Sequence, residues 1–243
     1  MVRDDLEPAF DPQSPEAQSM ERVIDVAMER FSLKPFSDAK LDGIAKEASV
    51  SKRMIHYHFG NKKGLYQAVL SRAVERLHPP AERLVIDSAI PVDGVRTVVE
   101  AVYAQIAENP VPTRMLHMES LQHVLPLRDI APLFDHAEVI LHLDKLLMLG
   151  QDAGVFRPGI SAYDVFYLIV ALSFYRTEQR DLAINIFGID LADEANTEGT
   201  RRMTIDAVLA FLTSNIPHSG HNSYLSVTHS VDDEPESAQS IYE

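Results

Sequence analysis

The sequence predicts an all-α protein in which a small N-terminal helical domain precedes a larger helical domain. Apolar residues recur at helical spacings of three and four positions through most of the 243 residues. No run of alternating apolar and polar residues flanked by hairpin turns is present, so we expect negligible β content. A proline pair at positions 79 and 80 interrupts the helical pattern. The predicted division is a disordered arm at 1–13, a first domain at 14–78, a second domain at 79–216 and a disordered tail at 217–243.

The first helix of this chain is predicted to start at Ser14 and Pro15, which suit the N-cap and the first helical position. Its pattern ends before Pro35, because the residue that precedes a proline disfavours helical geometry. The inner stripe of this helix consists of Met20, Val23, Ile24, Ala27 and Phe31.

A helix-turn-helix is predicted within residues 36–66. Apolar residues at positions 41, 44, 45 and 48 form one face of a helix about two turns long. Ser49-Val50-Ser51 then interrupts the helix, and Ser51 can cap the next one. In that second helix Ile55 and Phe59 lie one turn apart and can face inward, which leaves the opposite side free to enter a major groove.

The outward side of the second helix carries donors and an aromatic ring, which suit phosphates and base edges better than a core. Next, Asn61 can cap a helix over 62–78 whose first turn holds two lysines. Lysines oppose the helix dipole there unless an anion such as a DNA phosphate binds, and a solvated lysine pair is the alternative. The candidate residues for binding double-stranded DNA are Lys40, Ser51, Lys52, Arg53, His56, Tyr57, Lys62 and Lys63.

Positions 20–77 resemble the N-terminal domain of the TetR family of transcriptional regulators. The resemblance rests on VIDVAMERF in the first helix, on IAKEASVSKRMIHYHFGNKKGLY, and on AVL shortly after it. Two positions depart from the family pattern. Ser49 stands where glycine is usual and must adopt a left-handed or neighbouring conformation, which costs about 1–2 kcal/mol. Ala39 stands where a capping threonine is usual, so Asp38 or Ser37 is expected to cap that helix instead.

Composition excludes several other classes of protein. The absence of cysteine rules out disulfides, thiolate catalysis and cysteine-ligated zinc. The longest apolar run, Val165–Tyr175, has 11 residues and is too short to span a bilayer. The N-terminal residues contain no apolar stretch of signal-peptide length. We therefore expect a cytoplasmic protein that has no membrane partner.

Charge is distributed unevenly along the chain. The formal net charge is −14, yet residues 20–78 hold 11 Lys and Arg against 7 Asp and Glu, a difference of +4. The remaining residues hold 11 against 29, a difference of −18. A basic head on an acidic body is consistent with a protein whose head alone binds DNA.

The second domain is predicted to consist of helices near 95–106, 115–121, 133–150, 161–178 and 198–215. The helix at 161–178 is apolar nearly all round, so it must be buried on every side. A partner subunit is the best cover for such a helix in a chain of this size. We therefore expect a homodimer in which this helix and the last one pair with their copies, with Leu172 and Leu209 in the interface.

Methionine and aromatic residues of the second domain suit an adaptable apolar pocket, and equally an ordinary core. In TetR-like proteins this region holds a ligand site, so by resemblance a few of them are expected to line a cavity. Arg114 and His117 are the expected polar contacts, which implies an apolar ligand with an acidic or hydrogen-bonding group. The candidate pocket residues are Tyr103, Arg114, Met115, His117, Met118, Phe134, Phe166 and Phe174.

Neither a metal nor another cofactor is expected. The histidine pairs 117/123 and 136/142 are six residues apart, whereas helical metal pairs are three or four apart. Catalytic motifs such as GxSxG or HExxH do not occur. The predicted function is that of a homodimeric repressor, not an enzyme, which a small molecule releases from a palindromic operator. An all-α enzyme or metal-binding protein with a structural three-helix head, and an activator of the same architecture, are the alternatives.

Overall fold

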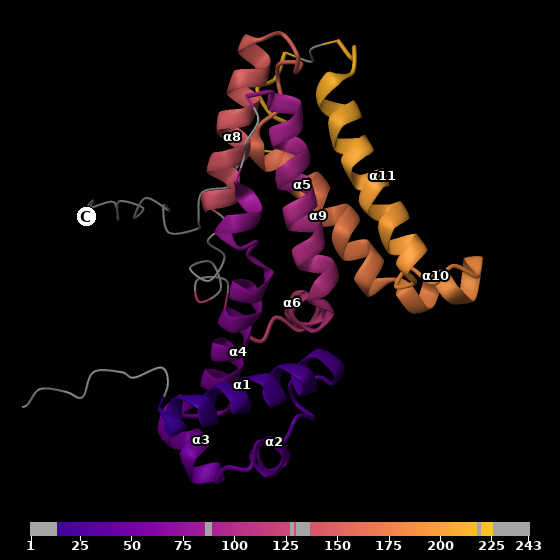
Figure 1. Cartoon of the computed structure of the whole chain (residues 1–243). Coiled ribbons are helices and arrows are strands. Elements are labelled where there is room, and N and C mark those ends of the chain that lie inside the picture. The colour runs from indigo at the N-terminus through magenta and orange to yellow at the C-terminus, as the bar shows by residue number, and fades with distance from the viewer. Residues whose placement is uncertain (1–13, 86–88, 127–128, 130–136, 218–219, 226–243) are drawn as a thin grey trace, which may run out of the picture.

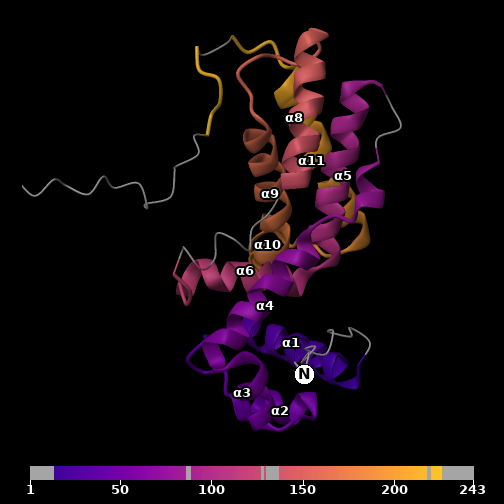
Figure 2. The same ribbon diagram turned by 90° about the vertical axis from the view of Figure 1, so that its left-hand side faces the viewer.

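The computed structural model describes residues 14–85, 89–126, 129, 137–217 and 220–225. Every regular element within these ranges is a helix, which confirms the all-α prediction. The chain forms a compact head at one end and a longer body of upright helices at the other (Figures 1 and 2). The head comprises α1 (Pro15–Leu33), α2 (Leu41–Ala48), α3 (Lys52–Phe59) and α4 (Lys62–Leu77), the last of which rises toward the body.

The head is held together by an aromatic cluster between α1 and α4. The rings of Phe31 and Tyr66 meet edge to face with centroids 5.0 Å apart, and Phe36 lies 5.2 Å from Tyr66 in the same manner. At the start of α1, the Ser14 side chain accepts from Ala17 N as an N-cap. This is the helix start that the Ser-Pro pair predicts.

The turn between α2 and α3 confirms one sequence expectation and corrects another. Ser49 is left-handed, with φ 60° and ψ 37°, as expected for the residue that replaces glycine. The N-cap of α2 is Lys40, whose side chain makes no capping hydrogen bond. Neither Asp38 nor Ser37 caps this helix, because the Ser37 hydroxyl donates to Asp38 Oδ1 instead.

The body contains long helices that run roughly away from the head, with α5, α8, α9 and α11 packed against one another. Two helices that the sequence analysis places at 133–150 and 198–215 are found at 137–152 and 194–213, and residues 130–136 lie outside the described ranges. The elements of the body are η1 (Ala81–Leu84), α5 (Pro91–Glu108), α6 (Pro110–Gln122), α8 (Ala137–Asp152), α9 (Ala162–Glu178), α10 (Arg180–Phe187) and α11 (Glu194–Thr213).

Helix α6 joins the body to the head. It lies across the base of the body, above α1 and beside α4 (Figure 2), and it packs against both of these helices. Met115 of α6 is fully buried in the core of the head, whereas Leu116 packs against the cores of both parts. Leu77 of α4 belongs to the core of the body. The predicted domain boundary at residue 78 therefore marks a break in the sequence pattern, whereas residues on both sides of it pack together.

Besides the short η1, two structured segments of the described chain are absent from the sequence expectations. The first is α10, a short helix that follows α9 almost directly. The second is residues 220–225, part of the predicted disordered tail, where the backbone N–H groups of Tyr224 and Leu225 donate to the Asp164 carboxylate at 3.1 and 2.8 Å. Burial alone would raise the pKa of Asp164, but these hydrogen bonds and those from Ser161 outweigh it and lower the pKa. Residues 220–225 of the predicted tail are thus placed beside the start of α9, and 226–243 lie outside the described residues.

Candidate nucleic-acid interface and ligand cavity

Helix α3 is anchored on one side and exposed on the other. Ile55 is fully buried in the core of the head, and Phe59 packs against that core one turn later. Arg53 and Tyr57 lie one turn apart on the exposed side, and the Tyr57 side chain is 80% exposed. An exposed guanidinium and an exposed phenol ring at this spacing can reach base edges and phosphates together.

Other predicted contact residues around α3 already have partners within the chain. The Ser51 hydroxyl accepts from Met54 N at 3.1 Å and serves as the N-cap. Lys52 Nζ lies 3.0 Å from Asp42 Oδ2, an exposed ion pair that contributes only about 0–1 kcal/mol and can be exchanged for a phosphate. His56 Nδ1 is bonded to Gly60 O at 3.0 Å, which leaves its second ring nitrogen for another contact. Lys40 is exposed at the start of α2.

Lys62 is a brace within the head. Its ammonium donates to Phe36 O and to Ser37 O, the latter at 3.3 Å, and lies 4.4 Å from the centroid of the Phe36 ring. Burial lowers the pKa of Lys62, and the charge of Asp38 opposes this shift. The ammonium therefore ties the start of α4 to the α1–α2 loop, in contrast to the free phosphate contact that the sequence predicts.

The helix start at α4 also differs from the expectation of free N–H groups. Asn61 Oδ1 accepts from Lys63 N at 2.8 Å and from Gly64 N at 3.0 Å. These two backbone donors are therefore capped from within the chain. Of the lysine pair, Lys63 has the exposed side chain, so it is the better candidate for a phosphate contact.

Replacing each lysine of the pair by methionine separates the two roles. Lys62→Met removes hydrogen bonds from a charged donor, so we expect the free energy of unfolding to fall by about 1–3 kcal/mol. Lys63→Met should leave stability within about 0.5 kcal/mol and lower the slope of log affinity against log salt by about one. Urea titrations and DNA binding at several salt concentrations measure both effects. If Lys62→Met leaves stability unchanged and reduces the salt slope, Lys62 contacts a phosphate and does not stabilise the head.

A cavity of about 230 Å³ lies between the body helices and the upper end of α4. Its wall is almost entirely apolar and comes from α4, α5, α6, α8 and α9. Because α4 and α6 also contact the head, a molecule in this cavity would touch the elements that connect the two parts. The lining residues are Val74, Leu77, Pro79, Val102, Ile106, Leu116, Val139, Phe166, Val170 and Phe174.

Two of the eight predicted pocket residues, Phe166 and Phe174, lie on the wall of this cavity. Met115 is buried in the core of the head instead, because α6 packs against α1 and α4. Tyr103 turns toward α11, where its hydroxyl bonds Thr197 O at 2.9 Å and Thr200 Oγ1 at 2.6 Å. The structure gives Met118 a half-buried position on α6, and Phe134 lies outside the described residues.

Arg114 and His117 of α6 lie near the last turn of α9. His117 Nε2 is 3.8 Å from Glu178 Oε2, and the side chain of Glu178 is only 10% exposed. Burial raises the pKa of Glu178, and the charges of His117 and Arg114 oppose this shift. Sequence reasoning missed Glu178, although it lies one helical turn beyond Phe174 on the same row of α9.

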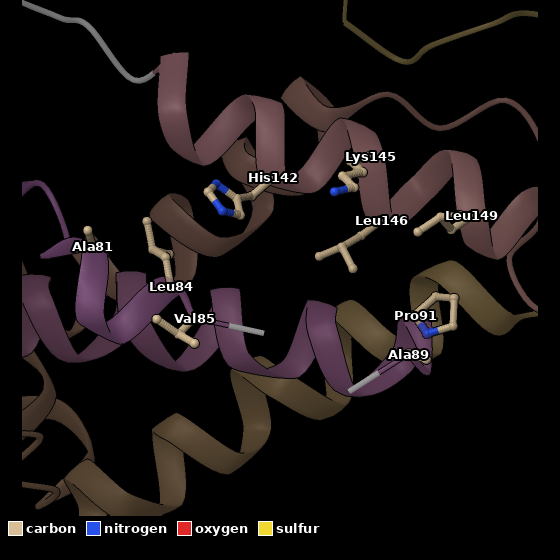
Figure 3. A pocket seen from close by; sticks show the side chains of 9 residues that line it. All are labelled: Ala81, Leu84, Val85, Ala89, Pro91, His142, Lys145, Leu146 and Leu149. Carbon is tan, nitrogen blue, oxygen red and sulfur yellow. The ribbon is translucent and has the colours of Figure 1, made fainter. Parts of the chain in front are cut away.

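A larger hollow of about 420 Å³ lies between η1, the start of α5 and α8 (Figure 3). In Figure 3 His142, Lys145, Leu146 and Leu149 of α8 line one side of the hollow, and the facing side is lined by Ala81, Leu84, Val85, Ala89 and Pro91. His142 Nδ1 is bonded to Glu138 O at 2.9 Å. None of its lining residues belongs to α4 or α6, so a molecule bound there would not touch the elements that reach the head.

Among the described residues no group of three or more His, Asp or Glu is arranged to hold a metal ion. None of the described helices is both long and apolar enough to cross a membrane.

Two family models match the chain. The model described as bacterial regulatory proteins of the tetR family matches residues 23–69, which run from α1 into α4. The model described as the tetracyclin repressor-like C-terminal domain matches residues 91–208, which run from α5 into α11. Head and body therefore each match a model of the same kind.

Individual regulators and solved structures are also similar to this chain over most of its length. The chain is 25% identical over 178 residues to the HTH-type transcriptional repressor NicS of Pseudomonas putida KT2440, which covers 73% of this chain and 84% of that protein. It is 26% identical over 200 residues to the HTH-type transcriptional repressor SCO4008 of Streptomyces coelicolor, with 79% and 92% covered. The crystal structure of the transcriptional regulator SCO4942 of Streptomyces coelicolor has a TM-score of 0.58 and 25% identity, with 80% and 98% covered. A tetR family protein of Rhodococcus RHA1 has a TM-score of 0.63, with 80% and 97% covered, and at 15% identity supports the fold alone.

Proposed function

This chain belongs to the TetR family of DNA-binding transcriptional regulators, and we propose that it is a dimeric repressor which a small molecule releases from a palindromic operator. The observation that carries the proposal is the double packing of α6. One side of this helix buries Met115 in the core of the DNA-binding head, and its neighbour Leu116 lines the apolar cavity. A ligand in the cavity therefore contacts a helix that is also part of the head.

In this proposal the exposed face of α3 enters the major groove. Arg53 and Tyr57 contact base edges, because both side chains are exposed one turn apart on α3. The positively charged side chains of Lys40, Lys52 and Lys63 contact phosphates around that groove. Ser51 caps α3, and His56 can contact DNA through the ring nitrogen that is not bonded to Gly60. Lys62 holds the α1–α2 loop in position beside α4.

The proposed dimer face lies on α9 and α11. Tyr163, Tyr167 and Tyr175 of α9 are all exposed, and their spacings of four and eight residues align them along one side of the helix. Met203 of α11 is exposed as well. Exposed large apolar groups on a helix of this composition favour burial by a second copy. Two copies would then present two α3 helices to successive major grooves, which is why the operator is expected to be palindromic.

Release by the ligand is proposed to follow from a shift between two dimer conformations. The ligand must bind better to the conformation whose α3 helices are wrongly spaced for DNA, since equal affinity for both would change nothing. A chain of hydrogen bonds leads from α6 to the head: Phe36 N donates to Gln122 Oε1 at 2.6 Å, and Phe36 O accepts from Lys62. A displacement of α6 would therefore pull on the loop that precedes α2.

Repression is favoured over activation by the names of the relatives. NicS and SCO4008 are both called transcriptional repressors. An activator would share the same architecture, because the position of the operator relative to the promoter decides the direction of the effect. An operator that overlaps the promoter would support repression. Because the operator DNA lies in the cytoplasm, the protein is proposed to act there.

Linkage provides the test of ligand release. Operator sequences are first selected from random DNA with the purified protein, and a panel of small molecules is screened for a rise in melting temperature. We expect a stabilising ligand to lower operator affinity by about 5–150-fold, or about 1–3 kcal/mol, and operator DNA to lower ligand affinity by the same factor. If every stabilising ligand leaves operator affinity unchanged, the release mechanism is wrong even though the protein binds DNA.

A further inference from the structure

A row of α9 side chains leads from the apolar cavity to a buried carboxylate. Phe166, Val170 and Phe174 line the cavity at intervals of four residues. Glu178 is the next residue on this row and the last residue of α9. It lies beside α6, which supplies Leu116 to the cavity wall and His117 to the surroundings of the carboxylate. Glu178 therefore lies one helical turn beyond the residues that line the cavity, on the same row of α9.

The carboxylate of Glu178 is poorly satisfied by the described part of the chain. Its Oε1 atom is buried and has no hydrogen-bond partner there, and the same is true of the neighbouring Thr177 Oγ1. The distance of 3.8 Å from Oε2 to His117 Nε2 is too long for a hydrogen bond. In addition, a carboxylate at the C-terminal end of a helix faces the negative end of the helix dipole. All of these features favour a donor or a positive charge from another molecule.

The buried Glu178 carboxylate changes the kind of ligand that is expected from the sequence. Arg114 and His117 suggest an acidic ligand when they are considered alone. In the structure, however, both act on Glu178, since their charges oppose the rise of its pKa. An acidic ligand would have to compete with Glu178 for these two side chains and would be repelled by its negative charge.

We propose that the Glu178 carboxylate is the polar subsite of the cavity and that the ligand is a small apolar molecule carrying an amino group. The apolar part occupies the cavity between Phe166, Phe174 and Leu116. Its ammonium donates to Glu178 Oε1, which has no hydrogen-bond partner among the described residues. This inference rests on the proposed function, because it concerns the chemistry of the ligand that occupies the proposed cavity.

A matched set of compounds tests the subsite on the full-length protein. Phenylbutylamine, phenylbutanol and phenylbutyric acid share one apolar part and differ only in the polar group. We expect the amine to bind at least tenfold more tightly than the alcohol and to give the largest rise in melting temperature, and the acid to bind most weakly. Calorimetric titration measures this ranking on the unaltered protein, so the result does not depend on the folding of any variant.

Two variants then assign the preference to one carboxylate. Glu178→Gln should lower the affinity for the amine tenfold or more and change the affinity for the alcohol by less than threefold. Glu194→Gln, which alters an exposed carboxylate at the start of α11, should change neither affinity. Binding of the alcohol and an ordinary melting curve without ligand verify that the glutamine variant is folded.

The possible outcomes separate this inference from the proposed function. Failure of the amine to bind, equal binding of the acid, or unchanged amine affinity in Glu178→Gln would each overturn the subsite. If the amine binds through Glu178 but leaves operator affinity unchanged, the subsite stands and release by this ligand site is wrong. If an alcohol or acid releases the operator with no contribution from Glu178, release stands and the subsite is wrong.

Discussion

A folded monomer with much weaker operator binding is the expected result of replacing Tyr167 by glutamate. Tyr167 is 62% exposed, between Tyr163 and Tyr175 on the outer side of α9. A charge there would be buried without a partner in the proposed dimer, whereas it would remain in water in the monomer. Loss of the second α3 helix removes the benefit of binding two half-sites together, so operator affinity should fall by about 10²–10⁴-fold.

Sedimentation at micromolar concentration and binding to a complete operator and to a half-site measure these effects. The matched control is Leu141→Glu, which places the same charge on a residue that is 66% exposed and belongs to α8, outside the two helices of the proposed interface. This control should remain a dimer and retain its operator affinity. A dimeric Tyr167→Glu protein, or an unaltered protein that is monomeric, would contradict the proposed interface.

Tyr167 is a sharper probe than the two residues that the sequence suggests. Leu172 and Leu209 are both partly buried, and Leu209 packs against the core of the body. A charge at either position would disturb the fold of the protomer as well as any interface. The apolar character of the 161–178 helix predicts that it needs cover on all sides, but only the structure separates the side covered by the protomer from the side that remains exposed.

The head could be predicted from the sequence because its signals are local. The apolar positions of α2, the Ser51 cap and the buried Ile55 each depend on residues within one or two helical turns. The same holds for Ser49, whose left-handed conformation follows from its position at the end of α2. In each case the helical period alone decides which side chains face inward.

The roles of Lys62 and Met115 could not be predicted in this way, because they depend on residues far along the chain. Lys62 Nζ turns back to carbonyl groups 25 and 26 residues earlier, where the α1–α2 loop happens to pass. Met115 lies in the core of the head and its neighbour Leu116 packs against both cores, because α6 is packed between the head and the body. A helix that is buried on two sides has no single apolar stripe, so its period does not reveal which core each residue joins.

The candidate ligand site shows the same limit. The sequence predicts Phe166 and Phe174 near a cavity because they are aromatic residues of the second domain, and they lie on its wall. Glu178 was not expected, since carboxylates are numerous in a chain of net charge −14. The signal that could have identified it is its position four residues after Phe174, at the end of a helix that is otherwise apolar.

The second large effect is expected at Arg53, whose replacement by alanine should abolish sequence preference at one base pair of each half-site. Arg53 is exposed on α3 one turn from Tyr57, so its guanidinium can donate two hydrogen bonds to a guanine. Each bidentate contact contributes about 1–3 kcal/mol to discrimination, and a dimer would lose two of them. Binding to unrelated DNA should fall only slightly, because it depends on the number of charges near the phosphates.

The control for this prediction is Arg22→Ala, which removes the same charge from an exposed residue of α1 in the same head. It should leave the preference for the operator over scrambled DNA unchanged. Binding of both variants is compared on the operator, on operators substituted at one base pair of each half-site, and on scrambled duplexes at several salt concentrations. A base contact requires that Arg53→Ala bind the operator and one of the substituted operators equally well. If Arg53→Ala instead weakens binding to all duplexes by the same factor, Arg53 contacts a phosphate, and base recognition must come from other residues of α3.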